Sequence, residues 1–248
     1  MRRFVVVLGT LALPVVCTAQ AGAKFPPDSL VNTRVIAHGT PVLNVIGTMR
    51  NFTSYLGVRC QYCHVGVEGQ PLEKFDFATD EKRSKVVARQ MMLMVQEINR
   101  RLDSLPAGVG AKLQVTCNTC HRGTTRPLPL STLISDAAIA GGADSALKTY
   151  RGLRDRYYGR DAYDFGEGSL NIAAFRLGGQ KKFDDAFAVL KLNEEFYPAS
   201  SGMYVFRGNI DLMKADTTAA EAAFREAVKR DPNNQEAKGR LQAIGKQP

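Results

Sequence analysis

Two strings of the chain share one spacing of cysteine and histidine, CQYCH at residues 60–64 and CNTCH at residues 117–121. This C-x-x-C-H pattern is the attachment signature of c-type haem. The two thiols add to the two vinyl groups on one side of a porphyrin, and two intervening residues let both thiols reach them. The histidine beside the second cysteine then lies under the ring, where its imidazole becomes the proximal ligand of the iron. The predicted attachment residues are Cys60 and Cys63 with His64, and Cys117 and Cys120 with His121.

Three other chemistries also use paired cysteines. A zinc ribbon usually separates its two pairs by about 15–20 residues, whereas 53 residues lie between Cys63 and Cys117. A thioredoxin-like motif needs a βαβ context, and the sequence shows no such pattern. Structural disulfides suit an exported chain, but they do not explain a histidine after each pair. Because two of the chain's three histidines follow these pairs, haem attachment is the favoured interpretation.

The residues before the first motif predict a helix that could cover a haem. Thr40 is a suitable N-cap, Pro41 suits the first helical position, and Gly57 can end the helix. Apolar residues recur at helical spacing through this segment, and Met49 lies in the middle of the stripe. We therefore predict Met49 as the distal ligand of the first haem iron. His38, the remaining histidine, is interpreted as an exposed residue before a turn.

A second helix is predicted over residues 80–102, before the second motif. Met91 and Met94 lie on its apolar face, whereas Met92 points away from that face. A methionine on an apolar stripe is usually core filler, but here a haem must be covered and the histidines are already used. We predict Met94 as the distal ligand of the second haem iron, with Met91 as the alternative.

Three stretches resemble the cytochrome c subunit family of photosynthetic reaction centres, and more closely the two-haem halves that occur as stand-alone bacterial proteins. They are MRNFTSYLGVRCQYCHVG (49–66), KFDFATDEKRSKVVARQMMLMVQEIN (74–99) and VTCNTCHRG (115–123), and the resemblance covers residues 33–127. In that family a helix before each motif usually supplies an axial methionine, which implies Met49 for one haem and Met94 for the other. The family's subunit has four haems, whereas this chain has motifs for two and ends in a domain that the subunit lacks. Service to a photosystem is therefore not implied.

The C-terminal half has a repeated helical pattern. The strings KKFDDAFAVLKLNEEFYPAS (181–200) and ADTTAAEAAFREAVKRDPNN (215–234) place matching residues 34 positions apart, which is the tetratricopeptide period. Further helices are predicted at 146–158, 170–177 and 203–213. Such units bury their apolar faces only against neighbours. The pattern therefore indicates either a concave surface for a partner protein or for self-assembly, or a stabilising appendage without a partner.

The first residues predict export. Arg2 and Arg3 precede a short apolar core, and small residues follow it, so a signal peptide is predicted over residues 1–21 with cleavage after Ala21. A lipid anchor on Cys17 is disfavoured because the bulky Val16 precedes it. The net charge of +9 could indicate a nucleic-acid partner. Export argues against such a partner.

The predicted fold class is all-α, with a compact two-haem cytochrome c domain over residues 22–130 and a tetratricopeptide-like helical repeat domain over 131–248. We expect two covalent haem c groups that carry electrons between redox partner proteins in the periplasm or outside the cell, without catalysis. The alternative is a dihaem oxidoreductase, peroxidase-like or sulfur-compound oxidising, with one open iron. A third hypothesis is assembly through the repeats, with itself or with a membrane electron-transfer complex. In such an assembly His38 could act as a ligand across an interface.

Overall fold

A computed structural model describes residues 24–106 and 113–247. Those residues form helices and connecting loops without a strand, apart from one isolated antiparallel bridge between Val65 and Asp76. The predicted all-α class is therefore confirmed. The predicted signal peptide, with Cys17 and the cleavage site after Ala21, lies outside the described residues. Within those residues no helix is both long enough and apolar enough to cross a membrane.

The chain divides into two compact units. Within the described residues, the first contains 24–53 and 59–97, and the second contains 54–58, 98–106 and 113–247. These units are defined by contacts within the chain and do not test the predicted domain boundary at residue 130, which stays a prediction.

The first unit holds most of two helices, α1 (Val42–Leu56) and α2 (Arg83–Asp103), with two short 3₁₀ turns between them, η1 (Cys60–Tyr62) and η2 (Leu72–Lys74). Helix α1 occupies the predicted segment, and α2 begins three residues later than predicted. The reason is a turn before it. The Asp76 carboxylate accepts hydrogen bonds from the N–H groups of Ala78 and Thr79 at 2.8 and 2.9 Å, and the Thr79 hydroxyl accepts from the Glu81 N–H at 3.3 Å. These local bonds hold the backbone outside the helical conformation.

Few apolar side chains are buried in the first unit. Among its described residues only Val45 and Phe75 are buried hydrophobic residues, and the long helix α2 buries Lys85 alone. Its apolar residues lie open instead, and the exposed ones are Val86, Val87, Met91, Leu93 and Met94. An amphipathic helix normally buries its apolar face. The apolar face of α2 therefore lacks the polypeptide cover that such a face requires.

The second unit contains the short α3 (Cys117–His121) and six further helices. These are α4 (Leu130–Tyr157), α5 (Glu167–Gly179), α6 (Phe183–Phe196), α7 (Gly202–Met213), α8 (Thr217–Arg230) and α9 (Gln235–Ala243). Helix α4 is interrupted at Gly141 and Gly142, where the latter has φ +72°. The predicted helices at 146–158, 170–177 and 203–213 correspond to the second part of α4, to α5 and to α7.

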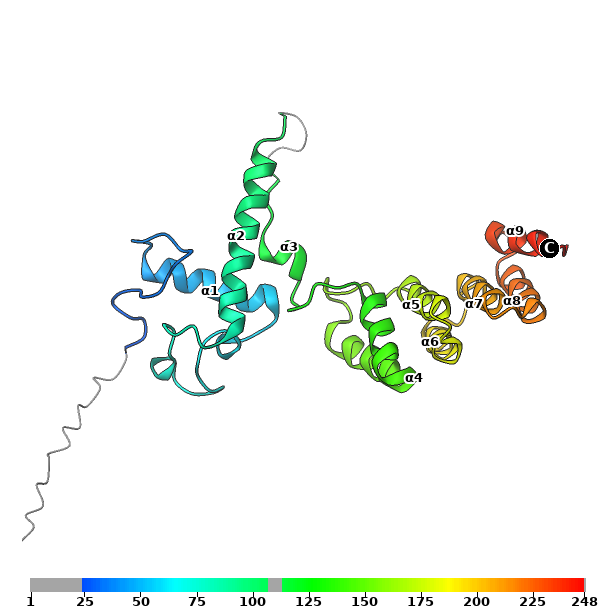
Figure 1. Ribbon diagram of the computed structural model, residues 1–248, viewed down its shortest axis with the longest axis horizontal. Coiled ribbons are helices and arrows are strands. Elements are labelled where there is room, and N and C mark those ends of the chain that lie inside the picture. Colours follow the sequence, from blue (N-terminus) through cyan, green and yellow to red (C-terminus); the bar gives the residue numbers. More distant parts are fainter. Residues whose placement is uncertain (1–23, 107–112, 248) are drawn as a thin grey trace, which may run out of the picture. The chain divides into compact units, whose positions relative to one another are not determined.

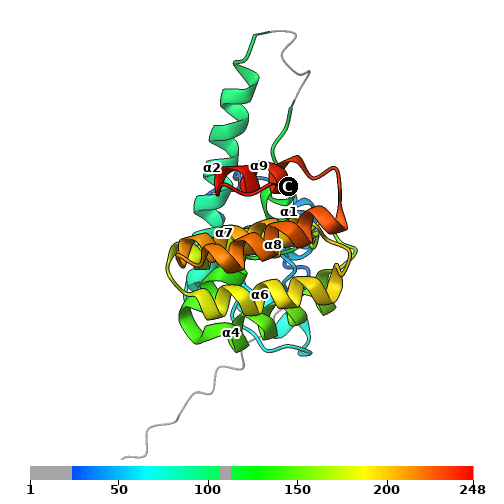
Figure 2. The ribbon, with the colours of Figure 1, turned by 90° about the vertical axis from the view of Figure 1, so that its right-hand side faces the viewer.

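Helices α4 to α9 bury apolar side chains in two clusters. Helix α5 packs on α4, α6 and α7, and α7 packs on α8, as the two ribbon views show (Figures 1 and 2). Tyr150, Leu170 and Val189 belong to one buried cluster, and Phe224 and Leu241 belong to a second. Each helix is thus covered by its neighbours, which is how helical repeats gain stability. Assignment of these helices to the tetratricopeptide family stays a prediction.

Candidate haem sites

The first cysteine motif is a tight turn that the start of α2 holds in place. The His64 N–H donates to the Cys60 carbonyl at 2.9 Å and closes one helical turn. The Lys82 ammonium donates to the carbonyl of Gln61 at 2.7 Å, and the Ser84 hydroxyl donates to the carbonyl of Tyr62. Both residues between the two cysteines are therefore fixed through their backbone. This arrangement leaves the thiols and the imidazole to bind a ligand.

The imidazole of His64 lies in an aromatic environment. Its ring meets the Phe77 ring edge-to-face at a centroid distance of 4.9 Å, and Phe77 stacks on Phe75. Burial and, to a smaller extent, the Lys85 ammonium lower the pKa of His64 to about 4, against the Phe77 backbone and the Asp76 carboxylate, which raise it. At neutral pH the ring is therefore neutral, which is the form that binds a metal.

The second motif forms the short helix α3. Side-chain hydrogen bonds hold the backbone at its start. The Thr116 N–H donates to the hydroxyl of Thr119 at 3.0 Å, as in one half of a capping box. The Asn99 side chain also binds both backbone groups of Val115, since its amide donates to the carbonyl at 2.9 Å and its oxygen accepts from the N–H at 2.7 Å. The backbone just before the second motif is thus held by Asn99 at Val115 and by Thr119 at Thr116.

A single hydrogen bond defines the tautomer of the second histidine. Nδ1 of His121 lies 2.8 Å from the carbonyl oxygen of Thr124. Because a carbonyl can only accept, Nδ1 must carry the proton, and Nε2 must carry the free lone pair. Hydrogen bonding at one imidazole nitrogen commonly orients a histidine for ligation through the other. His121 is therefore prepared to bind iron through Nε2.

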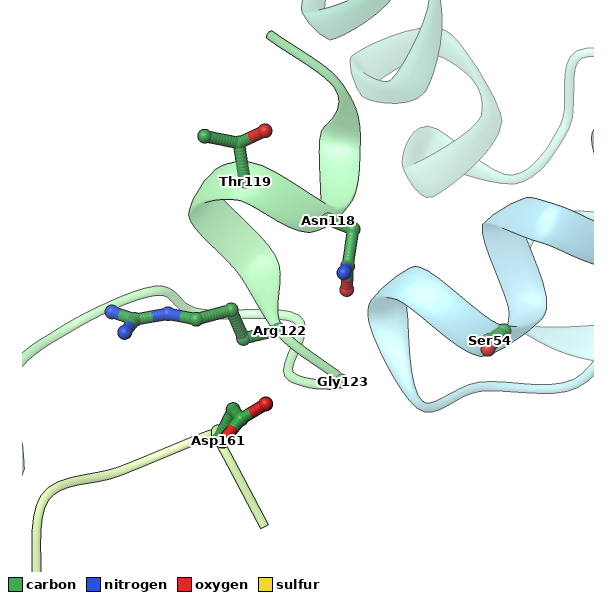
Figure 3. A pocket seen from close by; sticks show the side chains of 6 residues that line it. All are labelled: Ser54, Asn118, Thr119, Arg122, Gly123 and Asp161. Carbon is green, nitrogen blue, oxygen red and sulfur yellow. The ribbon is translucent and has the colours of Figure 1, made fainter.

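A polar pocket lies beside α3, on the side away from its cysteines and histidine (Figure 3). Its lining residues are Ser54, Asn118, Thr119, Arg122, Gly123 and Asp161. In a helix the residues at positions 117, 120 and 121 share one face, whereas 118, 119 and 122 lie on the opposite side. The pocket is therefore not the face of the cysteines and the histidine. Its hydroxyl, amide and charged lining also lacks the apolar character that a porphyrin requires.

The two predicted distal ligands lie on helices α1 and α2, where the sequence placed them. Met49 is partly buried on α1, and Met94 on α2 is 50% exposed, as expected for a residue without a polypeptide cover. Met91 is also exposed, and Met92 is partly buried. His38 is exposed in the loop before α1. Ligation by Met49 or Met94 stays a prediction.

The residues of both motifs fit covalent haem. All four cysteines, at positions 60, 63, 117 and 120, are free thiols. Nδ1 of His64 is buried without a hydrogen-bond partner in the part of the chain that the structure describes. The exposed apolar face of α2 offers a wall for a flat apolar macrocycle. Across the described ranges no three His, Cys, Asp or Glu side chains gather into a metal-binding group.

Comparison with known proteins agrees with this chemistry. The family model described as photosynthetic reaction centre cytochrome c subunit matches residues 18–146, just over half of the chain. The chain belongs to this family. Membership of a cytochrome c family implies covalently attached haem c. The resemblance expected from residues 33–127 is confirmed.

Three relatives of this cytochrome family illustrate the similarity. A photosynthetic reaction center cytochrome c subunit of Rubrivivax gelatinosus is 38% identical over 68 residues, which is 27% of this chain and 15% of the relative. One of Roseobacter denitrificans is 34% identical over 110 residues, or 44% and 28%. Cytochrome c-554 of Chloroflexus aurantiacus is 36% identical over 74 residues, or 29% and 16%. The chain thus spans less than a third of the length of each of these relatives. No solved structure matches it.

Proposed function

We propose that the protein is an exported dihaem c-type cytochrome that carries electrons between redox proteins and catalyses no reaction. The observation that carries this proposal is the state of the two histidines, since His64 is half-buried in its neutral form and His121 has Nε2 free. Cys60 and Cys63 would hold one haem, and Cys117 and Cys120 the other. When bound, each haem supplies one reversible electron transfer between ferric and ferrous iron.

The chain's own residues would set the conditions for that exchange. The cysteines fix each haem covalently, and the histidines bind the iron from the proximal side. Met49 and Met94 would close the distal positions, which leaves no coordination site for a substrate. The apolar residues of α1 and α2 would exclude water from the ring faces. Closed coordination is what separates an electron carrier from a haem enzyme.

Spectra of the purified protein test this proposal. We would record visible, near-infrared and electron paramagnetic resonance spectra of the oxidised and reduced forms, with and without carbon monoxide. Low-spin signals, a methionine-to-iron charge-transfer band and no response to carbon monoxide are expected. A high-spin component or a rapid shift with carbon monoxide would instead show an open iron, and would favour the dihaem oxidoreductase.

We propose a docking role for helices α4 to α9. Support comes from apolar residues that these helices leave in solvent, among them Ile172 and Phe175 on α5 and Met213 on α7. The Phe175 ring also packs edge-to-face on Phe206 of α7, so the two helices share one aromatic surface. Light scattering over a concentration series distinguishes the partners. A mass that rises with concentration indicates self-assembly, and a constant monomer mass excludes it over that concentration range.

A further inference from the structure

We propose that the two haem sites differ in reduction potential, with the higher potential at the site of His64, because Lys85 places a buried positive charge there and Thr124 accepts a hydrogen bond from His121 at the other site. This inference rests on the proposed dihaem electron transfer, and it adds which of the two haems has the higher reduction potential. Electrons would then settle at the first site and enter more readily through the second. The two observations come from different side chains and support the same order.

Lys85 is an unusual buried residue, since only 8% of its surface is exposed. Its ammonium donates to three successive backbone carbonyls, those of Phe77, Ala78 and Thr79, at 2.8, 3.0 and 2.8 Å. The Asp80 carboxylate lies 3.3 Å from the same nitrogen. Four oxygen acceptors around one nitrogen require the charged ammonium form. The loop that this lysine organises also carries Phe77, whose ring contacts His64.

Other charged groups near this site reduce the effect of Lys85 but do not cancel it. Arg89 binds Asp80 at 2.8 Å, and Arg34 lies 3.6 Å from the same carboxylate. The Asp76 carboxylate also acts on His64. Arg34 is 69% exposed and is screened by solvent, but the partly buried Lys82 ammonium binds the Gln61 carbonyl of the first motif at 2.7 Å. Lys82, Lys85 and Arg89 therefore outnumber the two carboxylates. A net positive environment disfavours ferric iron, which carries one more positive charge than ferrous iron, and therefore raises the potential.

The proximal histidines differ in a second respect. Nδ1 of His121 donates a 2.8 Å hydrogen bond to the Thr124 carbonyl. Nδ1 of His64 is buried without a hydrogen-bond partner among the described residues, although the Phe77 backbone acts on this imidazole to raise its pKa. A hydrogen bond at Nδ1 makes the imidazole a more basic ligand. A more basic ligand stabilises ferric iron and lowers the potential at the second site.

Thr124 acts as a positioning residue for this bond. It is 4% exposed, and its hydroxyl lies 2.9 Å from the His121 carbonyl and 3.2 Å from the Arg126 carbonyl. These contacts hold the turn that aims the Thr124 carbonyl at Nδ1. The nearby cations Arg122 and Arg126 are exposed to solvent. Water and salt screen exposed charges far more than a buried ammonium, so these arginines do not offset the hydrogen bond.

Spectroelectrochemical titration of the complete two-haem protein tests the order. In the titration each iron takes one electron from a chemical reductant, and no bond forms or breaks. We expect two resolved one-electron couples in the wild type. Lys85→Gln should lower the reduction potential of the higher couple by about 59 mV, which is about a tenfold change in its ferric–ferrous equilibrium constant. The potential of the lower couple should stay unchanged. Lys85→Arg keeps the charge and should preserve both couples. Lys74→Gln removes an exposed lysine of the same unit and should also preserve both.

Thr124→Val provides the second arm, because it removes the hydroxyl and keeps the shape of the side chain. The loosened turn should weaken the His121 bond and raise the lower couple alone, and Thr124→Ser should restore it. The order is overturned if Lys85→Gln moves the lower couple or neither couple, or if Thr124→Val moves the higher couple or neither. If Lys85→Gln fails to fold, the Thr124 pair still decides the assignment.

The same samples separate failure of this inference from failure of the proposed function. A protein with fewer than two covalent haems, or with an iron that binds carbon monoxide, contradicts the dihaem carrier itself. Two closed low-spin haems with equal potentials, or with the opposite response to the two variants, contradict only the order.

Discussion

The backbone of Gly57, at the end of α1, lies directly against the backbone of Gly123, which follows the second motif. The Gly123 N–H donates to the carbonyl of Tyr55 at 2.9 Å, so the two segments are joined by a hydrogen bond. A Cβ atom on Gly57 would overlap the Gly123 carbonyl oxygen, and Gly57 also has φ +63°. Only glycine meets both conditions without strain. The end of the first helix is thus tied to the turn beside His121.

Gly57→Ala should therefore destabilise the protein more than the loss of conformational freedom alone explains. Gly39→Ala is the matched control, because Gly39 has φ +83° and open space where a Cβ would lie. The control should cost about 1 kcal/mol, typical of an alanine forced into a left-handed conformation. Gly57→Ala should cost at least about 1 kcal/mol more, since its backbone must also move. Thermal unfolding of both variants measures the difference, and equal costs would contradict the close approach.

Methionine ligation is tested by substitution. Met49→Ala and Met94→Ala should each remove the distal ligand of one haem, open that iron to carbon monoxide, and halve the methionine-to-iron charge-transfer band. Met91→Ala is the control for Met94, because both side chains are exposed on the same helix. It should leave the band unchanged. If Met91→Ala halves the band and Met94→Ala does not, Met91 is the ligand of the second haem.

A buried carboxyl in α7 makes the stability of the repeat helices depend on pH. Asp211 is 5% exposed, and its Oδ2 has no hydrogen-bond partner within the described chain. Burial raises the pKa of Asp211, while Arg207 and Lys214 oppose that shift. The folded-state pKa lies above the unfolded value. Below about pH 3.9 the carboxyl is therefore protonated in both states, and its burial places no charge in the interior. Its contribution to stability is lost as the pH rises through the folded pKa.

Asp211→Asn should therefore raise the free energy of unfolding by about 1 kcal/mol at pH 7 and by little near pH 3.5. Urea unfolding at the two pH values measures this difference. Asp136→Asn is the control, because Asp136 is exposed on α4 and is not among the charged groups that act on Asp211. A gain that is equal at both pH values would contradict the buried charge.

The lack of an apolar interior in the first unit predicts unequal dependence on haem. A chain produced without haem attachment should lose most hydrogen-exchange protection in α1 and α2, because their apolar faces have no polypeptide cover. Helices α4 to α9 have their own buried clusters and should keep their protection. Exchange followed by mass spectrometry resolves the two regions. Equal protection throughout the chain would show that α1 and α2 are stable without the cofactor.

The features that sequence alone predicted are local ones. The two motifs depend on spacing within five residues, and the helices depend on a short period, so α1, α5 and α7 lie where the pattern placed them. The start of α2 was predicted too early, because the side chains of Asp76 and Thr79 bind the backbone of residues 78, 79 and 81. Side-chain capture of a turn depends on rotamers, which periodicity does not encode.

The residues that support the motifs were not predicted, and the reason is again physical. Lys85 lies in a polar stretch where a lysine normally faces water, and its burial follows from three carbonyls that only the folded loop brings together. Thr124 acts through its backbone carbonyl, which every residue type has. Asn99 stands within a string shared with the family, but its pairing with Val115 depends on the path of the intervening chain.

The most direct test of the dihaem assignment is the intact mass of the protein exported by a host that attaches c-type haem. The expected mass is that of residues 22–248 with two haems bound, and one haem should be lost in each of the variants Cys60→Ala/Cys63→Ala and Cys117→Ala/Cys120→Ala. A mature chain that carries one haem, or none, would contradict it.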